Sequence, residues 1–175
     1  GREDTDVRCL GRRPFILEVR EPRRRRLEWD ALAREVNASG QVEVDGLAPC
    51  ARDDVARLKD LRPDDAYRAV AELDREVAEA DLARLGGLVG VIRQRTPTRV
   101  LKRRSNRTRK RRVRSLEWKR LGPRRLELTV RAQAGTYIKE LVSGDGGRTE
   151  PCVAGVLGAE AECAELDVLA IHNDQ

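Results

Sequence analysis

The fold is decided by the stretch Leu126-Glu127-Leu128-Thr129-Val130-Arg131-Ala132-Gln133-Ala134, which runs directly into Gly135-Thr136-Tyr137-Ile138-Lys139-Glu140. In its first nine residues every second position is Leu, Val or Ala, and residues at that spacing share one face of a β-strand. Gly135 then ends the alternation, and a short apolar segment follows up to Val142. The sequence therefore predicts a strand over 126–134 with one buried face.

The flanking sequence predicts a mixture of strands and helices. Alternating apolar residues indicate strands over 15–20 and 41–47, and an apolar segment indicates a strand over 166–171. Helical patterns cover 27–36 and 51–60. Because these elements follow one another without a regular β-α-β order, the sequence predicts an α+β fold. The 175 residues suffice for one domain with a real core, or for two very small ones.

Charge is strongly segregated along the chain. Residues 93–125 contain sixteen Lys and Arg against one acid, Glu117, and carry a net charge of +15, whereas the remainder carries −9. A basic segment on an acidic body is typical of a protein that binds a polyanion, above all nucleic acid. A disordered basic linker is the alternative, but apolar residues such as Val113 and Trp118 interrupt the run.

The composition offers little for a metal centre or a membrane. One histidine, His172, is present, and no C-x-x-C pair occurs among the cysteines, which are Cys9, Cys50, Cys152 and Cys163. We therefore expect ordinary buried thiols, no metal, no cofactor and no Ser-His-Asp or Cys-His catalytic unit. Without a run of roughly 20 apolar residues or a leader, we expect a cytoplasmic protein that uses no membrane, and no protein partner is implied.

Three motifs stand out. The first is Gly1-Arg2-Glu3-Asp4-Thr5-Asp6-Val7-Arg8, which contains Arg-x-Asp and is followed by Leu10-Gly11 and Arg13-Pro14-Phe15. The second is Arg93-Gln94-Arg95-Thr96-Pro97-Thr98-Arg99-Val100, with Arg103-Arg104 and Arg109-Lys110-Arg111-Arg112-Val113 after it. The third is Gln133-Ala134-Gly135-Thr136-Tyr137-Ile138-Lys139-Glu140, which continues through Gly144-Asp145-Gly146-Gly147-Arg148-Thr149 to Pro151.

Taken in this order, the motifs resemble the pseudouridine synthases of one archaeal and eukaryotic family, the Pus-ten type, which modifies positions 54 and 55 in the T-arm of tRNA. An isolated Arg-x-Asp is a weak signal, whereas the third motif is long and matches the family almost letter for letter. The resemblance spans essentially the whole chain. It implies one catalytic domain over residues 1–175, here partial, with a mixed, mostly antiparallel sheet, flanking helices and a central RNA-binding cleft.

The resemblance also implies a chemistry. Pseudouridine formation breaks the N-glycosidic bond of uridine, rotates the base and rejoins it through C5. The reaction calls for a carboxylate beside the sugar, either as a nucleophile at C1′ or as a base at C2′, and for no metal or redox cofactor. By motif position Asp4 is that carboxylate, and Lys139 is the partner that keeps it ionised.

Further residues are implied to bind the substrate. Tyr137 lines the uracil pocket, Tyr67 stacks on the flipped base for roughly 1–3 kcal/mol, and Arg2 helps to displace the base. The basic segment over 93–125 grips tRNA phosphates. Its motif residues with this expected role are Arg93, Arg95, Arg99, Arg103, Arg104, Arg109, Lys110, Arg111 and Arg112.

A rival reading of a different class is a non-catalytic basic RNA-binding module. In that reading Asp4 is a solvated terminal acid, Lys139 is a surface lysine and the two tyrosines only pack their rings. The segment Gly144-Asp145-Gly146-Gly147 lacks the Gly-Lys-Ser/Thr of a P-loop, so we expect a structural turn in either case.

Three features depart from the family pattern. The strand that leads into the Asp4 loop and the family's amino-terminal RNA-binding domain with its zinc site are missing, so we expect a fragment. Asp65-Ala66 stand where Lys-Thr usually precede the tyrosine. The family places Tyr67 on a strand, whereas the Ala- and Glu-rich composition of 67–85 predicts a helix. We expect the strand, because tertiary context overrides propensity.

Overall fold

The computed structural model describes residues 7–60 and 63–172. The chain divides into two compact units. The larger unit comprises Gly1–Arg13 with Arg62–Gln175, and the smaller comprises Pro14–Leu61.

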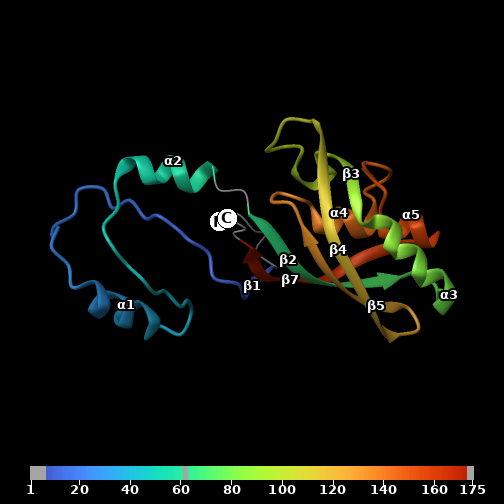
Figure 1. Cartoon of the computed structure of the whole chain (residues 1–175), viewed down its shortest axis with the longest axis horizontal. Helices are drawn as coiled ribbons and strands as arrows, with labels where there is room; N and C mark the ends of the chain where they lie inside the picture. The colour runs from blue at the N-terminus through green and yellow to red at the C-terminus, as the bar shows by residue number, and fades with distance from the viewer. Residues whose placement is uncertain (1–6, 61–62, 173–175) are drawn as a thin grey trace. The chain divides into compact units, whose positions relative to one another are not determined.

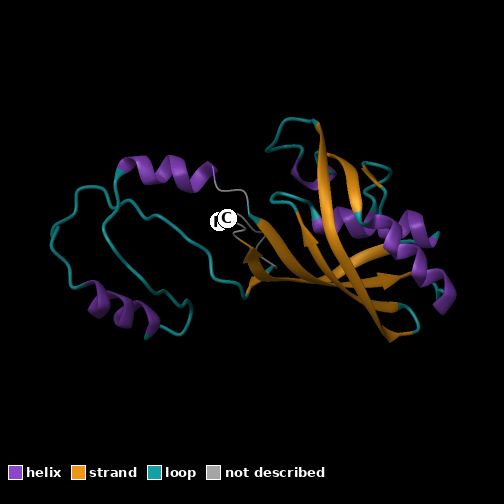
Figure 2. Ribbon diagram, viewed as in Figure 1, coloured by secondary structure: helices purple, strands orange, loops and turns teal. Residues whose placement is uncertain are grey.

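The larger unit is built on one mixed sheet (Figure 1 and Figure 2). Within the described residues its strands lie in the order β1-β7-β2-β5-β4-β3-β6. The β1–β7 pair is parallel and the other pairs are antiparallel, so the expected mixed, mostly antiparallel sheet is confirmed. The strands are β1 Arg8–Cys9, β2 Asp64–Leu73, β3 Gly90–Arg95, β4 Thr108–Gly122, β5 Arg125–Ala132, β6 Thr149–Glu150 and β7 Ala161–His172.

One face of this sheet forms the core. On β5, Leu126, Leu128, Val130 and Ala132 are each at most 1% exposed, whereas Thr129 between them is exposed. The buried face predicted for this strand is therefore confirmed. Burial of each large side chain stabilises the fold by about 1.5–3 kcal/mol.

Short helices cover the apolar face. They are α3 Glu79–Leu82, α4 Ile138–Ser143 and α5 Val153–Leu157, with the 3-10 turns η1 Ala83–Leu88 and η2 Thr98–Val100. Ile138 and Leu141 from α4 and Val153 from α5 join the same buried cluster as the β5 residues. The flanking helices predicted for the fold are thus present.

The β2 strand shows tertiary structure overriding propensity. Tyr67 pairs with Val130 of β5 and with Val168 of β7, so hydrogen-bonded strands lie on both sides. The strand position expected for Tyr67 is confirmed, and the helix that composition indicates over 67–85 is wrong for its first half.

The glycine-rich segment after α4 is a structural turn. Gly144 has φ +79°, and a Cβ at this position would lie 2.7 Å from Cys152 Sγ. The thiol in turn accepts a hydrogen bond from the Gly155 N–H at 3.3 Å, so it caps α5. Glycine is required at 144 because both the left-handed backbone and the close thiol exclude a side chain.

The smaller unit contains α1 Trp29–Asn37 and α2 Arg52–Asp60, which confirms both predicted helices. The strands expected over 15–20 and 41–47 are wrong, because both segments are irregular. The Asn37 side chain takes the place of a neighbouring strand for Val44: Nδ2 donates to its carbonyl at 2.9 Å, and Oδ1 accepts from its N–H at 2.7 Å. An alternating sequence does not by itself provide a neighbouring strand to pair with. The apolar side of 15–20 is not buried either, since Leu17 is 75% exposed.

In the part of the chain that the structure describes, none of the helices combines the length and the apolar character needed to cross a bilayer.

Candidate active site

The second and third motifs meet through a buried glutamine. Gln94 on β3 is 2% exposed. Its Nε2 donates to the Tyr137 carbonyl and its Oε1 accepts from the Tyr137 N–H, each at 2.9 Å. These two bonds fix the backbone of Tyr137, the residue immediately before α4, although 43 positions separate the two residues.

An ion pair fastens the same two motifs one turn further on. Arg99 Nε donates to Oε1 of Glu140 at 2.7 Å, and the Glu140 carboxylate is buried on α4. Close by, the Thr98 N–H donates to Asp145 Oδ2 at 2.8 Å. Arg99 therefore has a structural partner in addition to the phosphate contact expected for it.

The Gly-Arg-Thr part of the third motif completes this junction. Arg148 donates to the Thr96 carbonyl through Nη2 at 2.7 Å and to Asn106 Oδ1 at 2.8 Å. Thr96 is fully buried and donates its hydroxyl to the Ser105 carbonyl at 2.7 Å. The motifs are thus parts of one packed structure in which α4 has a fixed position.

Tyr67 lies on the helix-covered face of β2 and is 4% exposed. Its hydroxyl donates to Oδ2 of Asp65 at 3.1 Å. Asp65 is itself 6% exposed, and its Oδ1 lies 3.9 Å from Arg13 Nη2. Asp65 is therefore in direct contact with the predicted base-stacking tyrosine.

The predicted nucleophile Asp4 and the predicted Arg2 lie outside the described residues. The chain directly after them is anchored to the sheet. Val7 packs against the core, Cys9 pairs with Val168 of β7, and the Leu10 N–H donates to the Val168 carbonyl at 2.8 Å.

A charged network holds this anchor from the other face of the sheet. Arg8 donates to both oxygens of Asp167, from Nε at 2.8 Å and from Nη2 at 2.9 Å. Arg68 Nη1 adds a contact to Asp167 Oδ2 at 3.2 Å. The hydrogen bond from Arg8 is the main cause that holds the pKa of Asp167 below its ordinary value, and it also raises the pKa of Arg8. The side-chain hydrogen bond to Glu127 does most to raise the pKa of Arg68.

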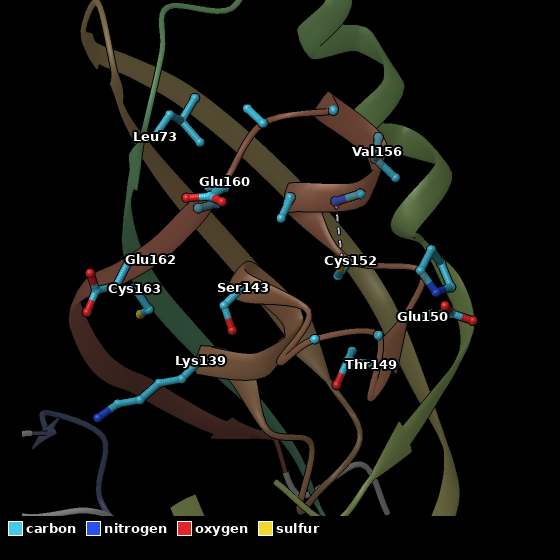
Figure 3. Close-up of a pocket in the computed structure, with 18 of the residues that line it drawn as sticks. Leu73, Lys139, Ser143, Thr149, Glu150, Cys152, Val156, Glu160, Glu162 and Cys163 are labelled. Atoms are coloured by element: carbon cyan, nitrogen blue, oxygen red, sulfur yellow. Dashed lines mark hydrogen bonds between the residues drawn. The ribbon is translucent and has the colours of Figure 1, made fainter. Parts of the chain in front are cut away.

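Lys139 lies on α4, two residues after Tyr137, and both residues are half-buried. Figure 3 shows Lys139 at one end of a groove that also borders α5 and β7, with its ammonium group extending away from Thr149 and Cys152. Five acids line this groove against three bases, so it is a poor surface for phosphates. The acids are Glu72, Asp74, Glu150, Glu160 and Glu162.

The predicted RNA-binding residues fall into two groups. Arg93 lies directly opposite Lys110 across β3 and β4, and Arg112 follows two positions along β4. These three side chains are exposed, as are Arg103 and Arg104. Four others are in contact with protein atoms; Arg95 Nε, for example, donates to Asn106 Oδ1 at 2.9 Å, and Arg111 Nε donates to the Gly135 carbonyl at 3.2 Å. The other two of this group are Arg99 and Arg109. We call Arg93, Lys110 and Arg112 the outer basic face.

Among the described residues, no three His, Cys, Asp or Glu side chains gather where they could hold a metal ion. The expectation of buried thiols is right for Cys152 and wrong for Cys9 and Cys50, which are exposed. Cys9 is on a short edge strand and Cys50 is in a loop.

Sequence reasoning missed the roles of four buried polar residues: Gln94, Glu140, Asp65 and Asp167. Gln94 and Glu140 lie inside the second and third motifs, and that position was the only indication in the sequence that they matter. Asp65 was noted only as a departure, and nothing near Asp167 in the sequence points to Arg8, 159 positions away.

Comparison with known proteins agrees with this geometry. The family described as "Pus10, C-terminal" matches residues 1–172, which is nearly the whole chain. The chain belongs to this family. The Pus10 resemblance inferred from the three motifs is therefore confirmed.

Curated Pus10 relatives cover the chain almost completely. The protein named tRNA pseudouridine synthase Pus10 from Methanothermobacter marburgensis is 49% identical over 98% of the chain and 43% of its own length. The protein of the same name from Korarchaeum cryptofilum is 44% identical over 98% of the chain and 48% of its own length. The chain thus spans less than half the length of the curated relatives it matches.

A solved structure supports the fold assignment. A chain in the crystal structure of a Cbf5-Nop10-Gar1 complex superposes with a TM-score of 0.53 and 26% identity, over 67% of this chain and 34% of that chain. The α+β architecture of this Pus10-family chain is therefore shared with a known structure.

Proposed function

We propose that this chain carries the catalytic centre of a tRNA pseudouridine synthase, a cofactor-free isomerase of the cytoplasm that converts uridine to pseudouridine with Asp4 as its nucleophile. The names of its Pus10 relatives support this activity over a non-catalytic RNA-binding module. The observation that carries the proposal is the register that links Cys9, Val168 and Tyr67.

Val168 pairs with Cys9 on one side and with Tyr67 on the other. Two strand spacings of about 4.8 Å therefore separate Cys9 from Tyr67 at the same level of the sheet. Asp4 is three residues before Val7, a reach of at most about 11 Å. Covalent geometry thus leaves Asp4 within reach of a base that stacks on Tyr67.

The proposed partner of Asp4 is Lys139. The α4 helix packs against β2 and β7, and β7 is the strand that pairs with β1. The bonds from Gln94 to Tyr137 and from Arg99 to Glu140 hold α4 in place. Lys139 therefore projects from a fixed helix, and a nearby ammonium group favours the ionised form of a carboxylate.

The proposed partner of the protein is tRNA, bound through its phosphates by the outer basic face. Arg93 lies opposite Lys110 on β4 and opposite Glu150 on β6, so an acid already offsets part of the repulsion between the two bases. A bound phosphate would offset the remaining positive charge of Arg93, Lys110 and Arg112. The substrate that we propose is the uridine at position 54, position 55 or both in the T-arm.

The experiment is pseudouridine formation on an unmodified tRNA transcript, detected by carbodiimide adducts and primer extension. The native chain is compared with Asp4→Asn, and transcripts with cytidine at position 54 or 55 locate the target. We expect a stop in the T-loop with the native chain that disappears with Asp4→Asn. A native chain that binds the transcript and forms no product, even with the amino-terminal part of a Pus10 relative added, would overturn the proposal in favour of the RNA-binding module.

A further inference from the structure

Two adjacent buried carboxylates open β2 and point to opposite faces of the sheet. Asp64 is 8% exposed and pairs with Arg114, whose Nε lies 2.9 Å from Oδ2. Asp65 is 6% exposed and lies on the same face as Tyr67, because residues two apart on a strand share a face. The two acids are therefore matched in burial and differ in what they contact.

Asp65 accepts a hydrogen bond from the Tyr67 hydroxyl at 3.1 Å and lies 3.9 Å from the guanidinium of Arg13. A buried carboxylate is costly unless it is paired, and both contacts offset that cost. The hydroxyl is the donor in this contact and the carboxylate oxygen is the acceptor. The buried Tyr67 hydroxyl thus has an acceptor two positions before it on the same strand.

We propose that Asp65 is a positioning residue that fixes the hydroxyl and ring of Tyr67 for contact with the target base. This inference rests on the proposed function. A phenol ring that holds a detached base must keep one plane, and a hydroxyl bonded to a buried carboxylate limits ring motion. Phosphate contacts dominate RNA affinity, so the effect falls on the catalytic step and leaves tRNA binding unchanged.

The experiment is a double-mutant cycle on kcat, with tRNA affinity and melting temperature measured for each variant. Asp65→Leu removes the acceptor, Tyr67→Phe removes the donor, and the double variant removes both. We expect each single variant to lower kcat about tenfold, and the double variant to be no slower than the slower single one. The affinity for tRNA stays within about twofold of the native value.

Two further variants separate positioning from folding. Asp65→Asn keeps an oxygen that can accept the hydroxyl hydrogen, so it retains more activity than Asp65→Leu at comparable stability. Asp64→Leu removes an acid of similar burial on the opposite face, so its effect on kcat is additive with that of Tyr67→Phe.

The outcomes distinguish this inference from the proposed function. An active native chain in which Asp65→Leu and Tyr67→Phe act additively on kcat, or are coupled only in melting temperature, overturns the positioning role and leaves the synthase activity standing. A native chain that makes no pseudouridine, either alone or with the amino-terminal part of a Pus10 relative added, removes the proposed function and this inference together.

Discussion

Gln94 holds both backbone polar groups of Tyr137, although the two residues belong to motifs far apart in the sequence. The amide nitrogen donates to the Tyr137 carbonyl and the amide oxygen accepts from the Tyr137 N–H, both at 2.9 Å. A side-chain amide is suited to this task because it carries a donor and an acceptor in one plane. The backbone of Tyr137, the residue before α4, is therefore held by a side chain from β3.

Gln94→Leu is expected to lower both stability and activity. The substitution keeps the side-chain volume but leaves the Tyr137 N–H and carbonyl without these partners. The cost of such buried groups is about 1–3 kcal/mol, measured by denaturant unfolding. Because Tyr137 then shifts, we expect kcat for pseudouridine formation to fall at least about tenfold.

Gln133→Leu is the control for that experiment. Gln133 is half-buried in the third motif, and the hydrogen bonds described for it use its backbone. We expect stability and kcat close to the native values. Equal losses in the two variants would show that the chain tolerates no leucine in this region, and would contradict a specific role for Gln94.

Arg99→Leu is expected to act mainly on the fold. It leaves the Glu140 carboxylate, 6% exposed, without this partner, while the Arg99 side chain is itself 36% exposed. Loss of one partner of a fully buried pair costs 3–5 kcal/mol, so we expect about 2 kcal/mol here. Adding Glu140→Leu should restore part of that loss. A single variant as stable as the native chain but weaker in tRNA binding would show that Arg99 serves RNA instead.

Removal of the outer basic face is expected to change the salt dependence of tRNA binding. Each phosphate contact contributes about 0.7–0.9 to the slope of log K against log salt, so the Ala variants of Arg93, Lys110 and Arg112 combined should reduce it by about 2–3. Fluorescence anisotropy at several salt concentrations gives the slope.

The matched control removes the same number of charges from the smaller unit. Arg23, Arg24 and Arg25 are exposed there, and their replacement by Ala lowers the net charge equally. We expect a smaller change in slope than for the outer basic face. An equal change would mean that net charge, and not its location, governs binding.

Local pattern predicted those elements whose burial depends on their own residues. The strand from Leu126 and both helices of the smaller unit follow from apolar periodicity. The segments over 15–20 and 41–47 alternate as well, yet neither forms a strand, because a strand also needs a neighbour to satisfy its backbone. For Tyr67 the reverse holds: neighbouring strands on both sides make its segment a strand, although its composition favours a helix.

The candidate site was predictable only as far as its motifs reach. The third motif pointed to Tyr137 and Lys139, and the family resemblance pointed to Tyr67, but spacing alone cannot show which polar residue pairs with which. Sixteen basic residues looked equivalent in the sequence. In the structure Arg99 is bound to Glu140, and Arg93 is exposed beside Lys110. Such contacts join residues far apart in the chain, and they cannot be predicted from the pattern of a single sequence.

The ion pair between Arg8 and Asp167 predicts a stability difference that depends on pH. Folding lowers the pKa of Asp167, so its ionised form stabilises the fold above the pKa of the unfolded state, about 3.9. That contribution is lost as pH falls through the lower pKa of the folded state. We expect Asp167→Asn to reduce the melting temperature by about 3–6 °C at pH 7, and by progressively less below about pH 4. Glu162→Gln, an exposed acid on the same strand, is the control and should differ little from the native chain at either pH. A deficit for Asp167→Asn that stays constant down to pH 2 would mean that the amide disturbs packing, and that the charge of Asp167 does not hold β1 against β7.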